Sequence, residues 1–569
     1  MKSGSNQFGT APVFFTAIST ILGAILFLRF GYAVGTVGFV GVLFIILLGH
    51  LVTIPTALAI SEIATNKRVE GGGEYFIISR SFGLNIGATI GIALFLSQAI
   101  SVAFYVIAFT EAFQFLFNYF ENQFCWFLPR QLVSIPMMLL LSWIILKKGA
   151  NLGVNTLYVV VGILTITIIL FFLGNSTYSA ESLNELSNFE FRNRDNFFLI
   201  FAIIFPAFTG MTAGVGLSGD LKNPAKSIPL GTLSATIIGM IIYFFIAQKL
   251  STGAPELDLV NDQFVMSKIA IGGAIVIPLG LAASTISSAL GSVMVAPRTL
   301  QALANDQSFP LDSTNNWLSK GRAKDGEPVN ASIVTCTIAI IFVALGDINV
   351  VASIISMFFM ITYGSLCLIS FLNHFGSSPS YRPSFKSKWY ISLVGFLAAV
   401  WIMFKIDVGY SILAFVIIFL IYIYINYVHH ERKGLSSIFT NAIFQINRGL
   451  QLLLQNSKVL KSTSEWRPNV ICLSESSFER DSAFRFLNWI SYTYGFGTYV
   501  HRIDNYYSKE THKKAEEELK KLIHNYGQNS HVYMDTLIAP SFTASIAQAL
   551  QIPSISGMEY NTFLLEYDK

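Results

Sequence analysis

Residues 205–214 read FPAFTGMTAG, with one proline and two glycines inside a long apolar segment. Pro206 has no amide hydrogen and glycine has a low helix propensity, so this stretch favours an interrupted helix. An earlier apolar segment holds a similar interruption at residues 19–26, STILGAIL, where Gly23 falls near the middle. Irregular backbone inside a membrane survives only where it lines a cavity. The two stretches therefore predict paired helix breaks that border a common site.

The composition around these stretches is that of a protein that crosses a membrane many times. Of 569 residues, 53% are hydrophobic and only 12% are charged, whereas about 25% are charged in soluble domains. Soluble enzymes, nucleic-acid-binding proteins and disordered proteins are excluded on this ground, and no nucleic acid partner is expected. A spanning helix needs about 20 apolar residues. We predict twelve such segments, at residues 11–36, 38–63, 86–117, 130–147, 150–173, 197–218, 228–249, 270–300, 331–346, 350–373, 389–405 and 408–428.

The two breaks fall in the first and the sixth of these segments, five segments apart. Such spacing is typical of an inverted-repeat transporter, in which two pseudo-symmetric halves of five segments each enclose the substrate site. Glycine and proline are common in membrane helices, so either break alone would carry little weight. Their corresponding positions favour a transporter that works by alternating access.

Broken helices can bind ions of both signs without ionisable side chains. The amides that begin a distal half-helix attract anions, and the carbonyls that end a proximal half attract cations. The candidate anion-binding amides are those of Gly23, Ala24, Ile25, Gly210, Met211 and Thr212.

A change in charge density divides the chain near residue 430. Residues 431–569 contain 29 of the 70 charged residues in a quarter of the length. The predicted domains are a transmembrane domain at 1–430, an amphipathic connecting helix at 431–465 and a cytosolic α/β domain at 466–569. Within them, we expect an amphipathic helix at 436–460, strands at 470–473, 499–503 and 563–565, and helices at 478–494 and 509–526. Alternating strands and helices predict a parallel sheet. The tail has no phosphate-binding glycine motif and no nucleophile elbow, so the protein is not expected to be an enzyme.

Lysine and arginine side chains favour one orientation in the membrane. With both termini in the cytoplasm, the inner loops carry fifteen of them and the outer loops at most six, in agreement with the positive-inside rule. We therefore expect a multi-pass protein of the cell membrane with both termini cytoplasmic. The four cysteines have no CxxC spacing, so the sequence indicates neither a metal site nor a disulfide framework. No cofactor is expected.

Five segments of the sequence are similar to one family. They are ILGAILFLRFGYAVG (21–35), EGGGEYFIISRSFG (70–83), FAIIFPAFTGMTAGVGLSGDLKNPAKSIPLGT (201–232), ISSALGSVMVAPRTLQAL (286–303) and the run 355–386. They resemble the cation-chloride cotransporters, a branch of the amino acid/polyamine/organocation superfamily. The chain is similar to a short member of this family, of the prokaryotic type. The resemblance implies an α-helical membrane protein with a leucine-transporter-type fold, a 5+5 inverted repeat and twelve transmembrane helices. It also implies symport of chloride with potassium, sodium or both, without net charge.

The same resemblance assigns candidate site residues. A potassium-type site would consist of Thr20, Ile21, Tyr105, Pro206 and Thr209. Chloride would meet Gly23, Ala24 and Ile25 at one position, and Gly210, Met211, Thr212 and the phenol of Tyr363 at another. A sodium-type site would consist of Ser19, Leu22, Ser284, Ser287 and Ser288, and an outer gate of Arg29 and Glu111. Serines also mediate helix packing in membranes and tyrosines anchor at the interface, so only the surrounding motifs give these residues their weight.

Some residues depart from the family pattern. Ser19-Thr20-Ile21-Leu22 stands where sodium-coupled members have Leu-Asn-Ile-Trp, and Ser284 stands where alanine is expected. The stoichiometry and the choice between sodium and potassium therefore stay open. About ten residues precede the first spanning segment, so regulation through a phosphorylated N-terminal region is not expected. The tail resembles the first half of the family's cytosolic domain. That domain accompanies dimerisation in the family, so the resemblance allows a homodimer. Membrane lipid is the other expected partner.

The main alternative is an amino-acid permease of the same superfamily. Such proteins usually hold the substrate carboxylate at a Gly-x-Gly break, whereas Gly23-Ala24-Ile25 offers a single glycine and a tighter fit, which favours chloride. An ion channel would need rings of charge or filter carbonyls along a pore, and no repeated filter motif is present. A sensor that does not transport would leave the paired breaks without a purpose.

Overall fold

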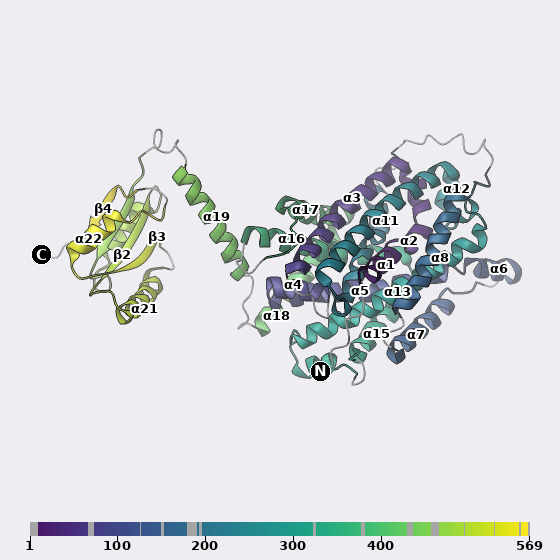
Figure 1. Ribbon diagram of the computed structural model, residues 1–569, viewed down its shortest axis with the longest axis horizontal. Helices are drawn as coiled ribbons and strands as arrows, with labels where there is room; N and C mark the ends of the chain where they lie inside the picture. Colours follow the sequence, from purple (N-terminus) through teal and green to yellow (C-terminus); the bar gives the residue numbers. More distant parts are fainter. Residues whose placement is uncertain are drawn as a thin grey trace. The chain divides into compact units, whose positions relative to one another are not determined.

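A computed structural model describes most of the chain, which divides into two compact units, Met1–Ala442 and Ile443–Lys569 (Figure 1). The described residues are 9–66, 73–125, 127–148, 153–178, 191–192, 196–322, 326–376, 382–429, 436–456, 466–493, 495–527, 530–556 and 559–566. Parts of several predicted features lie outside them: residues 70–72 of one motif, the end of the amphipathic helix at 457–460, Tyr494 at the end of a predicted helix, and the predicted domain boundaries at 430–431 and 465.

In the described part of the first unit, the regular elements are α-helices and 3-10 helices joined by turns and short loops. Its elements are α1 (Thr10–Ile21), α2 (Ala24–Leu28), α3 (Phe30–Asn66), α4 (Glu74–Phe82), α5 (Leu84–Glu111), α6 (Gln114–Phe124), α7 (Gln131–Lys148), α8 (Gly153–Leu173), α10 (Phe197–Ile204), the 3-10 helix η3 (Phe205–Asp220), α11 (Pro224–Gly253), α12 (Glu256–Asn261), the 3-10 helix η4 (Val265–Lys268), α13 (Gly273–Asn305), α14 (Asp312–Ser319), α15 (Val329–Leu345), α16 (Ile348–Gly376), α17 (Trp389–Ile406) and α18 (Val408–Val428).

Within the described residues, nine helical stretches are long and apolar enough to cross a membrane. They are Thr10–Leu28, Phe30–Asn66, Leu84–Glu111, Phe197–Val215, Pro224–Gly253, Gly273–Asn305, Ile348–His374, Trp389–Ile406 and Val408–Val428. Three shorter apolar helices, Gln131–Lys147, Tyr158–Leu173 and Val329–Leu345, occupy the other three predicted segments. The multi-pass helical architecture is thus confirmed, while the count of twelve crossings stays a prediction.

A turn at Gly38 separates the first predicted span from the second. Gly38 has φ 76° and ψ 170°, and it lies inside α3, which is otherwise continuous from Phe30 to Asn66. Only glycine adopts this conformation readily because it has no Cβ atom. α3 therefore contains the end of the first span and the whole of the second.

Both predicted helix breaks are present. In the first span, α1 ends at Ile21 and α2 begins at Ala24, with Leu22 and Gly23 outside helical geometry. In the sixth span, α10 ends at Ile204, two residues before Pro206, which cannot donate a backbone hydrogen bond. The chain then continues as η3 over 16 residues. The sixth span therefore passes from α to 3-10 geometry, and the second α half-helix that we expected from Gly210 onward is not observed.

Helices five spans apart pack against each other. α1 contacts η3, α3 contacts α11, α5 contacts α13, and α7 contacts α15. These are the first and sixth, second and seventh, third and eighth, and fourth and ninth predicted spans. Two interlocked five-helix repeats predict this pairing of counterparts. Figure 1 shows α1 inside the bundle, among α2, α5, α11 and α13.

The second unit contains a parallel α/β domain. Its sheet has the order β3-β2-β1-β4 and every pairing is parallel. After α19 (Ser436–Asn456), which crosses the boundary of the units, the elements are β1 (Asn469–Ser474), α20 (Ser482–Ser491), β2 (Phe496–Asp504), α21 (Lys509–Tyr526), β3 (Val532–Ala539), α22 (Phe542–Gln551) and β4 (Thr562–Leu565). Leu487 and Leu522 pack with Cys472 and Tyr499 of β1 and β2 on one face of the sheet. The predicted parallel sheet is confirmed, and α20 begins four residues later than expected.

Candidate functional site

The two helix breaks touch at Gly210. A Cβ atom added to Gly210 would lie 2.5 Å from the amide nitrogen of Ile21 and 2.7 Å from the carbonyl carbon of Thr20. Real Cβ atoms do not approach backbone this closely, so only glycine allows η3 to lie against the end of α1. The structure therefore brings together the two interrupted stretches that the sequence pairs.

A tyrosine that sequence analysis did not single out joins the breaks. Tyr243 of α11 is fully buried, and its hydroxyl donates to the carbonyl oxygen of Ile21 and to that of Ala207 at 3.5 Å. One side chain thus contacts the backbone of both breaks. The available signal was a phenol in the middle of the apolar segment 228–249, but the sequence did not show which way it faces.

Tyr363 of α16 makes the corresponding contact from another direction. Its hydroxyl donates to the carbonyl oxygen of Thr209 at 2.7 Å and lies 3.5 Å from the hydroxyl oxygen of Thr212. The Thr209 hydroxyl donates to the carbonyl oxygen of Pro206 at 2.8 Å. Residues assigned by resemblance to the potassium-type and second chloride positions therefore lie together on η3 and α16.

Tyr105 of α5 is the third phenol near this point. It is 7% exposed, and it interacts electrostatically with both Tyr243 and Tyr363. No hydrogen bond of its hydroxyl is found within the described residues. Tyr105 therefore keeps a hydroxyl available beside the two breaks, as a cation ligand would require.

Three serine hydroxyls lie near the first break. The hydroxyl oxygens of Ser19 in α1 and Ser287 in α13 are 3.4 Å apart. The buried hydroxyl of Ser288 has no hydrogen-bond partner in the described part of the chain, and it would lie 3.6 Å from a Cβ atom on Gly23. Ser284 instead donates to Leu281 within its own helix at 2.9 Å. The structure thus joins Ser19, Ser287 and Ser288 at the break, whereas no contact joins Ser284 to them.

The predicted anion-binding amides differ between the two breaks. Gly23 precedes α2 and no side chain caps its amides, so Gly23, Ala24 and Ile25 lie at a helix start as expected. Gly210, Met211 and Thr212 lie inside η3 rather than at a helix start. Amides inside a 3-10 helix bond to carbonyls three residues earlier. At the second position, the hydroxyls of Thr212 and Tyr363 both donate to the carbonyl oxygen of Thr209, so they would have to turn away from it to donate to an anion.

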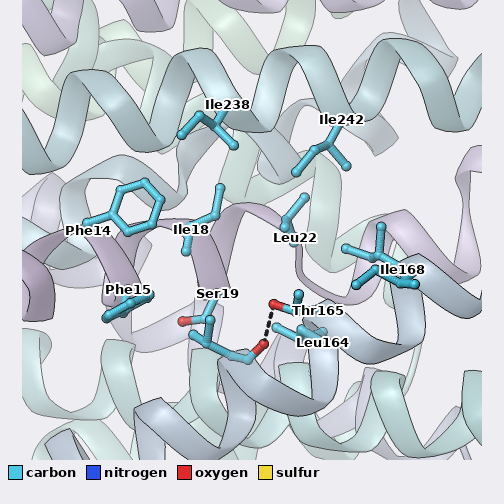
Figure 2. A pocket seen from close by; sticks show the side chains of 12 residues that line it. Phe14, Phe15, Ile18, Ser19, Leu22, Leu164, Thr165, Ile168, Ile238 and Ile242 are labelled. Carbon is cyan, nitrogen blue, oxygen red and sulfur yellow. Dashed lines mark hydrogen bonds between the residues drawn. The ribbon is translucent and has the colours of Figure 1, made fainter.

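A pocket of about 230 Å³ reaches the first break from the side of α8 and α11. Figure 2 shows Ser19 of α1 and Leu22, which directly follows α1, on its wall, facing Thr165 of α8 and Ile242 of α11. Its full lining is Phe14, Phe15, Ile18, Ser19, Leu22, Val161, Leu164, Thr165, Ile168, Ile169, Ile238 and Ile242. The Thr165 hydroxyl is engaged with the carbonyl of Val161 at 2.7 Å. The pocket is thus largely apolar and adjoins the predicted sodium-type position.

The predicted gate residues do not pair directly. Arg29, at the end of α2, donates from Nε to Asn349 Oδ1 at 2.9 Å. Glu111, at the end of α5 and 1% exposed, is paired with Arg130 just before α7. Arg29 and Glu111 interact electrostatically, but no ion pair between them is found among the described residues. The expected pair is therefore replaced by Glu111–Arg130, because the turn before α7 brings Arg130 to the end of α5.

Comparison with known proteins gives one family. A family model described as amino acid permease matches residues 12–468. Solute carrier family 12 member 2 of Mus musculus is 30% identical over 518 residues, which are 81% of this chain and 42% of that protein. Solute carrier family 12 member 1 of Mus musculus is 29% identical over 517 residues, 81% of this chain and 46% of that protein. An uncharacterized transporter of Schizosaccharomyces pombe is 27% identical over 498 residues, 82% and 46% of the two chains. The chain spans less than half the length of these relatives.

Proposed function

The chain belongs to the amino acid permease family and is a membrane transporter rather than an enzyme, and from this we propose that it is a secondary-active symporter that couples chloride to potassium, sodium or both. The family resemblance in the sequence motifs is confirmed. What we propose beyond the family is which ions are coupled and which residues bind them.

The contact between the two breaks carries the proposal. Gly210 lies against Thr20 and Ile21, and the Tyr243 hydroxyl reaches carbonyl oxygens of both breaks, those of Ile21 and Ala207. These oxygen ligands are hard and uncharged, which suits alkali cations. Uncharged ligands do not neutralise a bound cation, and an anion held nearby offsets its charge. A site of this kind favours joint binding of a cation and chloride.

The orphaned hydroxyl of Ser288 supports a second cation position. Buried polar groups are almost always hydrogen-bonded, so one without a partner indicates a site for a ligand or an ordered water. Ser19 and Ser287 add two further hydroxyls beside it. A set of hydroxyl and carbonyl oxygens suits a small cation such as sodium.

The gating part of the proposal rests on the cluster at the ends of α2, α5 and α16. With both termini in the cytoplasm, this cluster lies at the outer side of the membrane. Separation of Glu111 from Arg130 and of Arg29 from Asn349 would release α5 and α2 from their neighbours there. Rocking of one helix bundle against the other would then expose the site alternately to the two sides.

Tracer uptake into proteoliposomes tests the coupling. We expect rubidium or sodium influx that requires chloride on the same side of the membrane, and chloride influx that requires one of these cations. Uptake of an amino acid without any need for chloride would overturn the proposal. That outcome would support the second candidate, an amino-acid permease, which the matching family model favours.

Two single substitutions separate the cation positions. Tyr105→Ala is expected to abolish rubidium influx because it removes the free phenol beside both breaks, and Tyr424→Ala, an exposed tyrosine of α18, is the matched control. Ser288→Ala is expected to weaken sodium dependence selectively, with Ser365→Ala as control, since Ser365 bonds only within its own helix. Full sodium coupling in Ser288→Ala would remove the sodium-type assignment.

A further inference from the structure

Among the described residues of the transmembrane unit, one buried carboxyl group has no basic partner. Glu74 is the first residue of α4, directly after Gly73, whose φ is 54°. Its side chain is only 5% exposed, and Oε2 has no hydrogen-bond partner within the described residues. α4 packs against α3, α5, α13, α16 and η3, so Glu74 is enclosed on all these sides.

The other two glutamates that are buried in the described part of this unit are paired, which makes Glu74 distinct. Glu62 of α3 accepts a hydrogen bond from Ser387 and contacts the ring of His374 at 3.1 Å. Glu111 is paired with Arg130. Removing a carboxylate from water without a partner of opposite charge is expensive, and such a group takes up a proton instead. Burial accordingly raises the pKa of Glu74 to about 8, and the nearby Thr212 side chain lowers it by less.

Glu74 faces the residues assigned to the second anion position. Its carboxyl group lies near the side chain of Thr212 and its charge acts on Tyr363, in line with the packing of α4 against both η3 and α16. These two hydroxyls lie 3.5 Å apart. An anion held by them would meet the Glu74 carboxyl group as its neighbour.

No described charged group on the surrounding elements neutralises Glu74. Both Glu74 and Tyr105 of α5 act on Tyr363 of α16. The other charged groups have partners elsewhere: Glu62 with His374, Asp306, which follows α13, with Tyr75 and Arg80, and Arg298 of α13 with Glu327. Whether Glu74 is protonated thus depends on its burial and on the ligand bound at the neighbouring position of Thr212 and Tyr363.

We propose that the Glu74 carboxyl group is a proton-binding site linked to the anion position formed by Thr212 and Tyr363, so that an anion binds there together with a proton. The inference rests on the proposed function, since it concerns the chloride position of that site. A carboxylate oxygen takes one proton from water, and the neutral acid then offers its O–H as a further donor to the anion. Without the proton, the carboxylate and the anion repel each other at close range in a region of low dielectric constant.

The test measures the apparent dissociation constant for chloride at pH 7 and pH 9, from chloride-dependent thermal stabilisation of the purified full chain and from chloride dependence of tracer influx. If only the protonated form binds, the apparent constant is the intrinsic one divided by the protonated fraction. With the pKa near 8, the wild-type protein should bind chloride about tenfold more weakly at pH 9 than at pH 7. Glu74→Gln, which is neutral at both pH values, should show a ratio near one. Glu121→Gln, on the exposed side of α6, is the matched control and should keep the tenfold ratio.

The outcomes separate this inference from the proposed function. Equal chloride affinity of the wild-type protein at both pH values overturns the inference, as does a pH dependence that survives in Glu74→Gln. A pH dependence through Glu74 in rubidium or sodium affinity, but not in chloride affinity, assigns the carboxylate to a cation and also overturns it. Glu74→Asp keeps a titratable group and should keep the pH dependence if Glu74→Gln fails to fold. Wild-type protein whose cation influx ignores chloride at every pH contradicts the proposed function instead.

Discussion

At the scale of single residues, two phenols donate to carbonyls of the two breaks and a third lies near these two phenols. Tyr105, Tyr243 and Tyr363 come from α5, α11 and α16, and two of them donate to carbonyls of Ile21 and Thr209. A carbonyl oxygen has two lone pairs, so the Ile21 oxygen can accept from Tyr243 and still face an ion. The Thr209 oxygen instead accepts from both Tyr363 and Thr212. The tyrosines therefore hold the interrupted backbone in place, and at the first break they leave a ligand position open.

Tyr243→Phe should lower cation influx at least tenfold while the protein still folds. The substitution leaves the Ile21 carbonyl without its donor, which costs about 1–3 kcal/mol for a buried group and loosens the first break. Tracer influx and the melting temperature of the purified protein check this. Tyr424→Phe, at 55% exposure, should change neither quantity. Equal influx in the two variants would show that the Tyr243 hydroxyl is dispensable.

Arg130→Ala should destabilise the protein more than Arg29→Ala. Glu111 is 1% exposed and depends on Arg130 for its ion pair, so loss of Arg130 leaves a buried carboxylate. Such losses cost up to about 3–5 kcal/mol in a fully buried pair, and less is expected here because the Arg130 side chain is 47% exposed. Thermal unfolding in detergent compares the two variants. Glu111→Gln added to Arg130→Ala should restore part of the stability, and a larger loss from Arg29→Ala would instead favour the Arg29–Glu111 pair.

At the scale of elements, the two breaks are built differently. The first is a gap of two residues between α1 and α2, and the second is a change from α10 to η3. The positions of both could be predicted, because Pro206 and Gly23 act on their own helix. Their form could not, since it depends on Gly210 being pressed against Thr20 and Ile21 by the fold.

Gly210→Ala should abolish transport and lower the melting temperature. Its Cβ atom would lie 2.5 Å from the Ile21 amide, so η3 and α1 would have to separate, and overpacking of this kind costs about 1–3 kcal/mol. Gly291→Ala is the matched control, since a Cβ atom on Gly291 of α13 meets nothing within 4 Å. Influx and thermal unfolding of both variants decide the matter. Normal influx in Gly210→Ala would contradict close contact between the breaks as a requirement for function.

The sequence could predict several site residues, but not the contacts that these residues make with distant parts of the chain. Tyr105, Thr209, Thr212 and Tyr363 were expected and do lie near one another. Tyr243 was not expected, because a lone phenol in an apolar segment does not show whether it faces lipid or the site. The pairing of Glu111 with Arg130 was also missed, since residues 19 positions apart meet only through the turn between α6 and α7.

At the scale of the whole molecule, the positions of elements were largely predictable and their packing was not. Apolar segments and alternating strands gave the membrane helices and the parallel sheet, because both patterns are local. The contacts between helices five spans apart follow from the repeat, which the paired breaks alone revealed. The inward and outward sides of the molecule are still a prediction, resting on the lysine and arginine count.

Cysteine labelling tests that orientation. Cys125, which follows α6, is exposed, whereas Cys336, Cys367 and Cys472 are buried. A membrane-impermeant maleimide should therefore label intact cells at Cys125, which lies in a predicted outer loop, and Cys125→Ser should abolish the labelling. Labelling of Cys125 only after the membrane is opened would show that the orientation is the reverse.

The geometry of η3 also determines how far that stretch reaches. A 3-10 helix rises about 2.0 Å per residue and an α-helix about 1.5 Å, so the 16 residues of η3 extend roughly 8 Å further than they would as an α-helix. Each four residues that rewind into α geometry shorten the stretch by about 2 Å. The length of the sixth span therefore depends on whether η3 is a 3-10 helix or an α-helix. A ligand that binds more tightly to one of these two forms would shift the ends of η3 along the helix axis.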